Sequence, residues 1–189
     1  MEKTTAANEM PEPWLRGMGS GTPAVQRAVV HALQQAREDL DKWCGELTDE
    51  EVNARPGGVA PVAFHLRHIA RSLDRLLTYA EGRQLSEEQL TKLKTEMEPG
   101  AKTAEVLGET RRAVEKSIER VRATDAARLE EPRSVGRKHL PTTLGGLLVH
   151  CAEHTQRHVG QAVTTAKIVA AWGGKFTREN QNIDSFRET

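Results

Sequence analysis

The stretch His150-Cys-Ala-Glu-His154-Thr-Gln-Arg-His158-Val-Gly-Gln161 does most to decide how this chain folds and where its chemistry lies. It belongs to a longer segment, Leu140 to Trp172, whose apolar residues recur with the period of a helix. Thr142 or Thr143 is suited to cap the start of this helix. Gly173-Gly174 stand where a helix commonly ends on a left-handed residue. We therefore predict one long C-terminal helix.

Two histidines of this stretch, His154 and His158, fall inside the apolar stripe of the helix, and His150 lies at its margin. Side chains four residues apart project from the same helical face, about 6 Å apart, so both imidazoles can reach one metal ion. Two core histidines, each with its own hydrogen-bond acceptor, would explain the pattern equally well. A metal site would also need at least one ligand from another part of the chain.

Composition and charge narrow the classes of protein. With 189 residues the chain is long enough for one domain with a substantial core. Basic and acidic residues balance at 27 each, which gives no sign of nucleic acid or membrane as a partner. Aromatic residues, at 4%, are too few to favour a β-sandwich or a base-stacking surface. Without a long apolar run, a signal peptide or a disulfide framework, a cytoplasmic protein is expected.

Three further long helices precede the C-terminal one. Apolar stripes predict them over about Ala24–Glu46, Pro61–Glu81 and Thr103–Ala123. Two capping boxes, Thr48-Asp-Glu-Glu51 and Ser86-Glu-Glu-Gln89, predict short accessory helices. No segment shows the alternation of a strand. The predicted fold class is all-α, a four-helix bundle.

The bundle is expected to span residues 23–174. Residues 1–22 are predicted to form an N-terminal extension, and Trp14 within it stands in an extended segment fixed by prolines on either side of Glu12. Residues 175–189 are polar and predicted to form a C-terminal tail.

A metal site between helices of a bundle is commonly built from inward-facing side chains. The second long helix offers His65, which borders its apolar stripe, and His68, which lies about 120 degrees from the centre of the stripe. Periodicity alone therefore favours His65, although a helix with two neighbours can also bury His68. Cys151 is interpreted as a small buried residue rather than as a fourth ligand.

These motifs resemble those of the DinB/YfiT-like superfamily of bacterial four-helix bundles, whose helices run up-down-down-up. The resemblance rests on His68-Ile-Ala70 and on His154-Thr-Gln-Arg-His158-Val-Gly-Gln161, with support from Arg55-Pro-Gly57 and Thr143-Leu-Gly145. It implies that His68, His154 and His158 bind one divalent metal ion, most often nickel or zinc. For the third ligand the resemblance thus favours His68 over His65.

The resemblance also implies a function, since some members of the superfamily are thiol-dependent transferases or isomerases. We expect a metal-dependent S-transferase or isomerase that acts on a small molecule with a low-molecular-weight thiol as cosubstrate, and a homodimer. His65, His150 and Gln161 are candidates to contact substrate or to support a ligand histidine. The sequence identifies no further catalytic residue.

Two other functions stay open at this stage. A metal-dependent hydrolase would use the same three histidines but needs a general base, and no inward-facing aspartate or glutamate stands out on the long helices. A non-enzymatic, stress-related metal-binding protein would have a closed coordination sphere and would lose stability on chelation.

Overall fold

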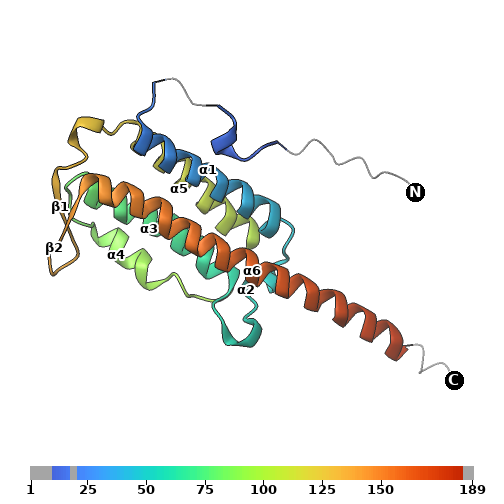
Figure 1. Cartoon of the computed structure of the whole chain (residues 1–189). Helices are drawn as coiled ribbons and strands as arrows, with labels where there is room; N and C mark the ends of the chain where they lie inside the picture. The colour runs from blue at the N-terminus through green and yellow to red at the C-terminus, as the bar shows by residue number, and fades with distance from the viewer. Residues whose placement is uncertain (1–9, 18–20, 185–189) are drawn as a thin grey trace.

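The computed structural model describes residues 10–17 and 21–184, and its main body is a bundle of four long helices (Figure 1). These helices are α1 (Ala24–Cys44), α3 (Val62–Ala80), α5 (Thr103–Arg122) and α6 (Leu144–Asp184). Short helices connect or flank them: η1 (Pro13–Leu15), α2 (Asp49–Asn53), η2 (Pro56–Gly58), α4 (Glu87–Lys94) and η3 (Ala126–Arg128). The predicted all-α bundle is confirmed. None of the described helices is both long and apolar enough to cross a membrane.

Helices α3 and α5 run in the same direction. Thr110 donates a hydrogen bond to the carbonyl of Leu66, and further along both helices Arg120 forms an ion pair with Glu81, just past the end of α3. The connection between the two helices therefore has to return along the whole bundle, and α4 packs against α3 on the way. Part of the candidate metal centre lies on this returning connection.

Helices α1 and α6 also run in the same direction. The Gln156 side chain donates to the carbonyl of Ala32, and the ammonium group of Lys167 lies 3.8 Å from the ring centroid of Trp43. Each long helix packs against two others, in the cyclic order α1, α6, α3, α5. Because α3 and α6 are antiparallel, as their histidine pairs show below, the bundle has the predicted up-down-down-up order.

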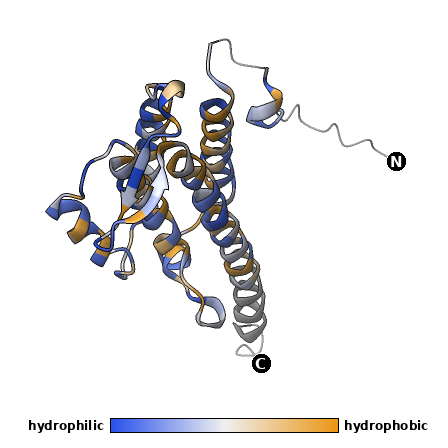
Figure 2. Ribbon diagram, turned by 60° about the vertical axis from the view of Figure 1, so that its left-hand side comes forward, coloured by the Kyte–Doolittle hydropathy of each residue, from blue (hydrophilic) through white to orange (hydrophobic). Residues whose placement is uncertain are grey.

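The core is formed by the apolar stripes of the four long helices. Side chains that are fully enclosed include Leu33 of α1, Leu66 and Leu73 of α3, Val114 of α5 and Leu148 of α6. Burial of each such side chain stabilises the fold by about 1.5–3 kcal/mol relative to exposure. Both hydrophilic and hydrophobic residues recur along every long helix (Figure 2), as expected for helices with one face inside.

The predicted helix starts are largely confirmed. Thr48 and Ser86 both form complete capping boxes, with Glu51 and Gln89 respectively. Thr143 caps α6, because its hydroxyl accepts a 3.0 Å hydrogen bond from the backbone of Gly146. These local hydrogen bonds satisfy amide groups that the first helical turn leaves without partners.

Two expectations about the chain are wrong. The first is that the chain has no strands: β1 (Pro132–Val135) and β2 (Leu140–Thr143) form an antiparallel hairpin. Four residues per strand are too few for a clear alternation, and the turn depends on positive φ angles at Gly136 and His139. The second was the end of α6, which continues through Gly173-Gly174 to Asp184. Each glycine costs an established helix only about 1 kcal/mol and does not stop it.

The predicted boundaries of the extension and the tail stay predictions. Residues 1–9, 18–20 and 185–189 lie outside the described residues. Within the extension, η1 packs against α1, where Arg16 forms a double hydrogen bond with Glu38. The Trp14 side chain remains 61% exposed.

Candidate metal centre

Three histidines from two antiparallel helices converge in the bundle. His68 comes from α3, and His154 and His158 come from α6; their ligand nitrogens all lie within 4.8 Å of one another. The Nε2 atoms of His68 and His154 are 2.8 Å apart. The ring centroid of His158 lies 4.4 Å from that of His68 and 4.7 Å from that of His154. The structure thus brings together the three residues proposed as metal ligands.

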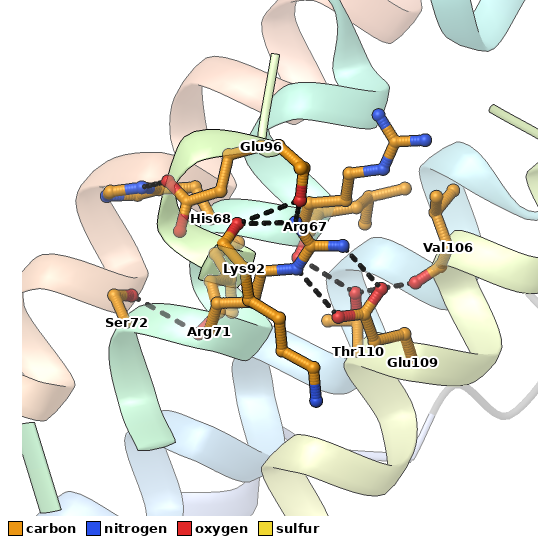
Figure 3. Close-up of polar contacts among 12 residues, drawn as sticks. Arg67, His68, Arg71, Ser72, Lys92, Glu96, Val106, Glu109 and Thr110 are labelled. Carbon is orange, nitrogen blue, oxygen red and sulfur yellow. Dashed lines mark hydrogen bonds and ion pairs between the residues drawn. The ribbon is translucent and has the colours of Figure 1, made fainter. Parts of the chain in front are cut away.

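A buried carboxylate holds the outer side of His68. Glu96 lies in the connection just after α4, and its Oε2 atom is 2.7 Å from Nδ1 of His68. Its other oxygen accepts a 2.7 Å hydrogen bond from Arg75 of α3. The Glu96 side chain is only 5% exposed. Figure 3 shows this carboxylate beside His68, on the connection that crosses α3. The contact favours a proton on Nδ1 and leaves Nε2 of His68 free to act as a ligand.

A fourth histidine holds the outer side of His158. The Nδ1 atoms of His65 and His158 lie 3.0 Å apart, so one ring donates a hydrogen bond and the other accepts it. His65 is buried, with only 5% of its surface exposed. When His158 is the donor, its Nε2 lone pair is free on the opposite side of the ring. His65 is therefore in a position to support a ligand histidine, one of the two roles expected for it.

Phe64 closes one side of the cluster. Its ring stacks on that of His68, with centroids 5.3 Å apart, and meets the rings of His65 and His158 edge on. These contacts limit how far the imidazoles can turn. Aromatic pairs at such distances contribute about 0.5–1.5 kcal/mol beyond the area that they bury.

The electrostatics keep most of the cluster neutral. Burial, followed by the neighbouring imidazoles, lowers the pKa of His65, His154 and His158 to about 4. Burial opposes ionisation of Glu96, but the hydrogen bonds from His68 and Arg75 outweigh it, and the pKa of this carboxyl lies below its usual value. At neutral pH His65, His154 and His158 are therefore uncharged, and Glu96 is a carboxylate.

Two other predicted residues lie outside the cluster. The His150 side chain is 44% exposed; its ring lies 5.4 Å from that of His154, and its Nδ1 lies 3.6 Å from the carboxylate of Glu153. Gln161 is exposed, and no hydrogen bond joins it to the histidines among the described residues. Gln161 thus has no contact that would let it hold a ligand.

Cys151 packs in the core, as expected. It is fully buried, and burial raises the pKa of its thiol to about 12. A thiol with such a pKa is protonated at neutral pH, and Cys151 does not belong to the group of converging ligand atoms.

The sequence reasoning missed Glu96. No inward-facing carboxylate was expected on the long helices, and the one found lies between helices, where periodicity gives no signal. Its burial depends on His68 and Arg75, which are 28 and 21 residues away along the chain. The nearby Pro99-Gly100 break marks a loop but does not show which residue points inward.

Comparison with known proteins places the fold and the cluster in one family. The sequence model of the DinB superfamily matches residues 32–162, a range that includes all three converging histidines and Glu96. The chain belongs to the DinB superfamily. A solved structure, the crystal structure of the conserved protein of locus from Enterococcus faecalis, is similar with a TM-score of 0.64 and 19% sequence identity, over 79% of this chain and 99% of that one. No curated protein sequence matches the chain.

The donor set of this DinB-superfamily protein fits a divalent transition metal. Neutral imidazoles suit zinc and nickel, and a carboxylate behind a ligand histidine is the usual support in such sites. The 2.8 Å between the Nε2 atoms of His68 and His154 is slightly less than the roughly 3.3 Å between two ligands of tetrahedral zinc. A displacement of about half an ångström therefore separates the present pair from a metal-binding pair.

Proposed function

We propose that this DinB-superfamily protein is a divalent-metal-dependent enzyme, a thiol-dependent S-transferase or isomerase that acts on a small molecule. The observation that carries the proposal is the convergence of His68, His154 and His158, with their nitrogens within 4.8 Å. Three neutral ligands leave an ion its full charge and at least one open position, as in catalytic rather than structural sites.

The roles of the residues follow from their contacts. His68, His154 and His158 would hold a nickel or zinc ion, which supplies the charge that lowers the pKa of a bound thiol. Glu96 fixes the tautomer of His68, and His65 does the same for His158. These two outer contacts keep the imidazoles oriented before a substrate arrives, which reduces the cost of reorganisation during the reaction.

A residue at the edge of the cluster is suited to meet the substrate. His150 lies one turn before His154 and presents a partly exposed imidazole next to it. An imidazole can both donate and accept hydrogen bonds through its two nitrogens. We therefore assign to His150 the contact with the electrophilic substrate.

The position of Glu96 weighs against hydrolysis. Both of its oxygens are engaged, one by His68 and one by Arg75, on the side of His68 that faces away from His154. Within the described part of the chain no other carboxylate forms a hydrogen bond with a ligand histidine. A hydrolase of this kind would need a free general base beside the attacking water.

The test begins with elemental analysis of the untagged protein and of three variants. We expect about one nickel, zinc or similar ion per chain in the parent, and little in His154→Ala and His158→Ala. The matched control is His150→Ala, which removes an imidazole from the same helix outside the converging group and should retain the ion. A parent that binds no ion, even after incubation with nickel or zinc, would remove the basis of the proposal.

The second step tests the reaction. The metal-loaded parent is assayed for thiol transfer to small electrophiles with several low-molecular-weight thiols, and His154→Ala is assayed in parallel. We expect metal-dependent turnover that His154→Ala loses. Turnover that is equal with and without the ion would show that the thiol chemistry does not use the histidine site.

A further inference from the structure

A polar cavity lies on another side of α3 from the histidine cluster. It is bounded by α3, α4 and α5 and has a volume of about 600 Å³. Pockets for small molecules typically measure about 300–1,000 Å³. None of the four clustered histidines lines it. The cavity is thus large enough for a metabolite and separate from the proposed metal centre.

The lining of this cavity is predominantly basic. Six of its side chains are cationic and three are anionic; the cations are Arg71, Arg83, Lys92, Arg112, Lys116 and Arg120. Each carboxylate already has a cationic partner within the lining. Arg120 is 3.0 Å from Asp74, Lys92 is 2.7 Å from Glu88, and Arg71 is 2.9 Å from Glu109. The carboxylates therefore leave positive charge in excess.

Two exposed cations of α5, Arg112 and Lys116, carry this excess, because the remaining lining cation, Arg83, forms an ion pair with Glu81, which does not line the cavity. In the part of the chain that the structure describes, neither Arg112 nor Lys116 forms an ion pair or a hydrogen bond through its side chain. Arg120 binds Glu81 and Asp74, yet its Nη2 atom is buried without any hydrogen-bond partner. A buried donor without an acceptor is unfavourable, so an acceptor supplied by a ligand would remove that penalty.

The sequence of α5 sets these cations in a row. Arg112, Lys116 and Arg120 follow one another at intervals of four residues, so they share one face of the helix over about 12 Å. Like charges at this spacing destabilise a helix unless something neutralises them. Four residues earlier stands Gly108, and a Cβ atom there would lie only 3.2 Å from the guanidinium of Arg112. Gly108 thus gives this guanidinium room to lie along the helix.

We propose that the cavity binds a small molecule that carries phosphate groups, and that Arg112 and Lys116 contact them while Arg120 supplies a donor from inside. A guanidinium can donate two parallel hydrogen bonds to phosphate oxygens, and a lysine adds a compact charge. The row on α5 is long enough for two phosphate groups. Ser86 at the start of α4 also lines the cavity, and its hydroxyl, which accepts a hydrogen bond from the backbone of Gln89, keeps its own proton to donate to a ligand.

Calorimetric titration of the metal-free protein with pyrophosphate tests this site. Removal of the metal prevents the anion from binding through an ion at the histidines, so the outcome is independent of the proposed enzymatic function. The test variant is Arg112→Gln with Lys116→Gln. The matched control is Arg122→Gln with Lys138→Gln, which removes the same two residue types from exposed positions that do not line the cavity.

We expect one pyrophosphate per chain in the parent, at least tenfold weaker binding in the test variant, and binding within twofold of the parent in the control. Both double variants should keep the thermal unfolding midpoint of the parent within a few degrees, because all four side chains are exposed. Absence of saturable binding in the parent, or equal weakening in both double variants, would overturn the proposal. Tighter binding of citrate than of pyrophosphate would overturn the assignment to phosphate.

Discussion

Replacement of Glu96 by glutamine tests whether the buried carboxylate prepares the metal centre. Glutamine keeps the shape of the side chain and one oxygen, but it removes the negative charge. The contact of 2.7 Å with Nδ1 of His68 then loses its ionic character, as does the contact of 2.7 Å with Arg75. We expect weaker metal binding even though none of the three ligands is altered.

The size of the effect follows from the burial of the contacts. Removing the support behind a ligand histidine typically weakens metal binding 10- to 100-fold, which corresponds to about 1.4–2.7 kcal/mol. The side chains of Glu96 and Arg75 are only 5% and 11% exposed, so solvent screens their interaction little. The metal-free variant should therefore also lose roughly 2 kcal/mol of unfolding free energy, the usual worth of a hydrogen bond to a charged group.

Competition with a chelator of known affinity measures the dissociation constant for zinc or nickel, and urea unfolding of the metal-free protein measures stability. The matched control is Glu109→Gln. It removes a carboxylate of α5 that is paired with Arg71, an arginine of α3 like Arg75, and that forms no hydrogen bond with a ligand histidine among the described residues. It should leave metal affinity unchanged. Equal metal affinity in Glu96→Gln, Glu109→Gln and the parent would refute the role assigned to Glu96.

Three further outcomes are expected. Cys151→Ser should leave the metal content unchanged, and loss of the ion would instead make Cys151 a ligand. The same variant should lower the free energy of unfolding, measured in urea, by about 1–3 kcal/mol, because it buries a hydroxyl group in an apolar site. Thr143→Ala should cost about 1 kcal/mol by the same assay, because α6 loses its cap, and no change would show that the cap is dispensable. The pKa values of His65, His154 and His158, about 4, lie below the ordinary 6.5, so the unfolded chain binds more protons between these limits. The metal-free protein should therefore lose stability as the pH falls from about 6.5 to 4, and a flat profile in that window would contradict the assignment.

The long helices could be predicted from the sequence because their signals are local. Ala24–Cys44 and Thr103–Arg122 differ from the predicted ranges by only one or two residues at their ends. Their apolar stripes recur every three or four residues, and their ends carry capping or turn residues close in sequence. The same reasoning overestimated the ability of Gly173-Gly174 to end a helix. Each glycine lowers helix stability by only about 1 kcal/mol, which is too little to stop a helix that has already formed.

The parts that escaped prediction depend on contacts between distant residues. The hairpin formed by β1 and β2 is too short to show alternation, and it is stabilised by its neighbours, for example through the hydrogen bond from Arg133 to the carbonyl of Ala80 on α3. Glu96 is polar and stands between helices, so its sequence context suggests exposure. Only the return of the chain over α3, which the parallel arrangement of α3 and α5 requires, carries it to His68.

The choice between His65 and His68 shows what periodicity can and cannot settle. Residues three apart on a helix are neighbours on one side, so both can face α6, and each meets a different histidine there. His65 lies opposite His158, and His68 lies opposite His154. Periodicity correctly ranks His65 as the more buried of the two, but burial does not make a ligand. His68 has a carboxylate on one nitrogen and a second imidazole on the other. Among the described residues, the only side chain within hydrogen-bonding range of the His65 ring is His158 itself. The partner behind each ring, rather than its depth in the bundle, therefore decides which histidine is prepared to bind a metal ion.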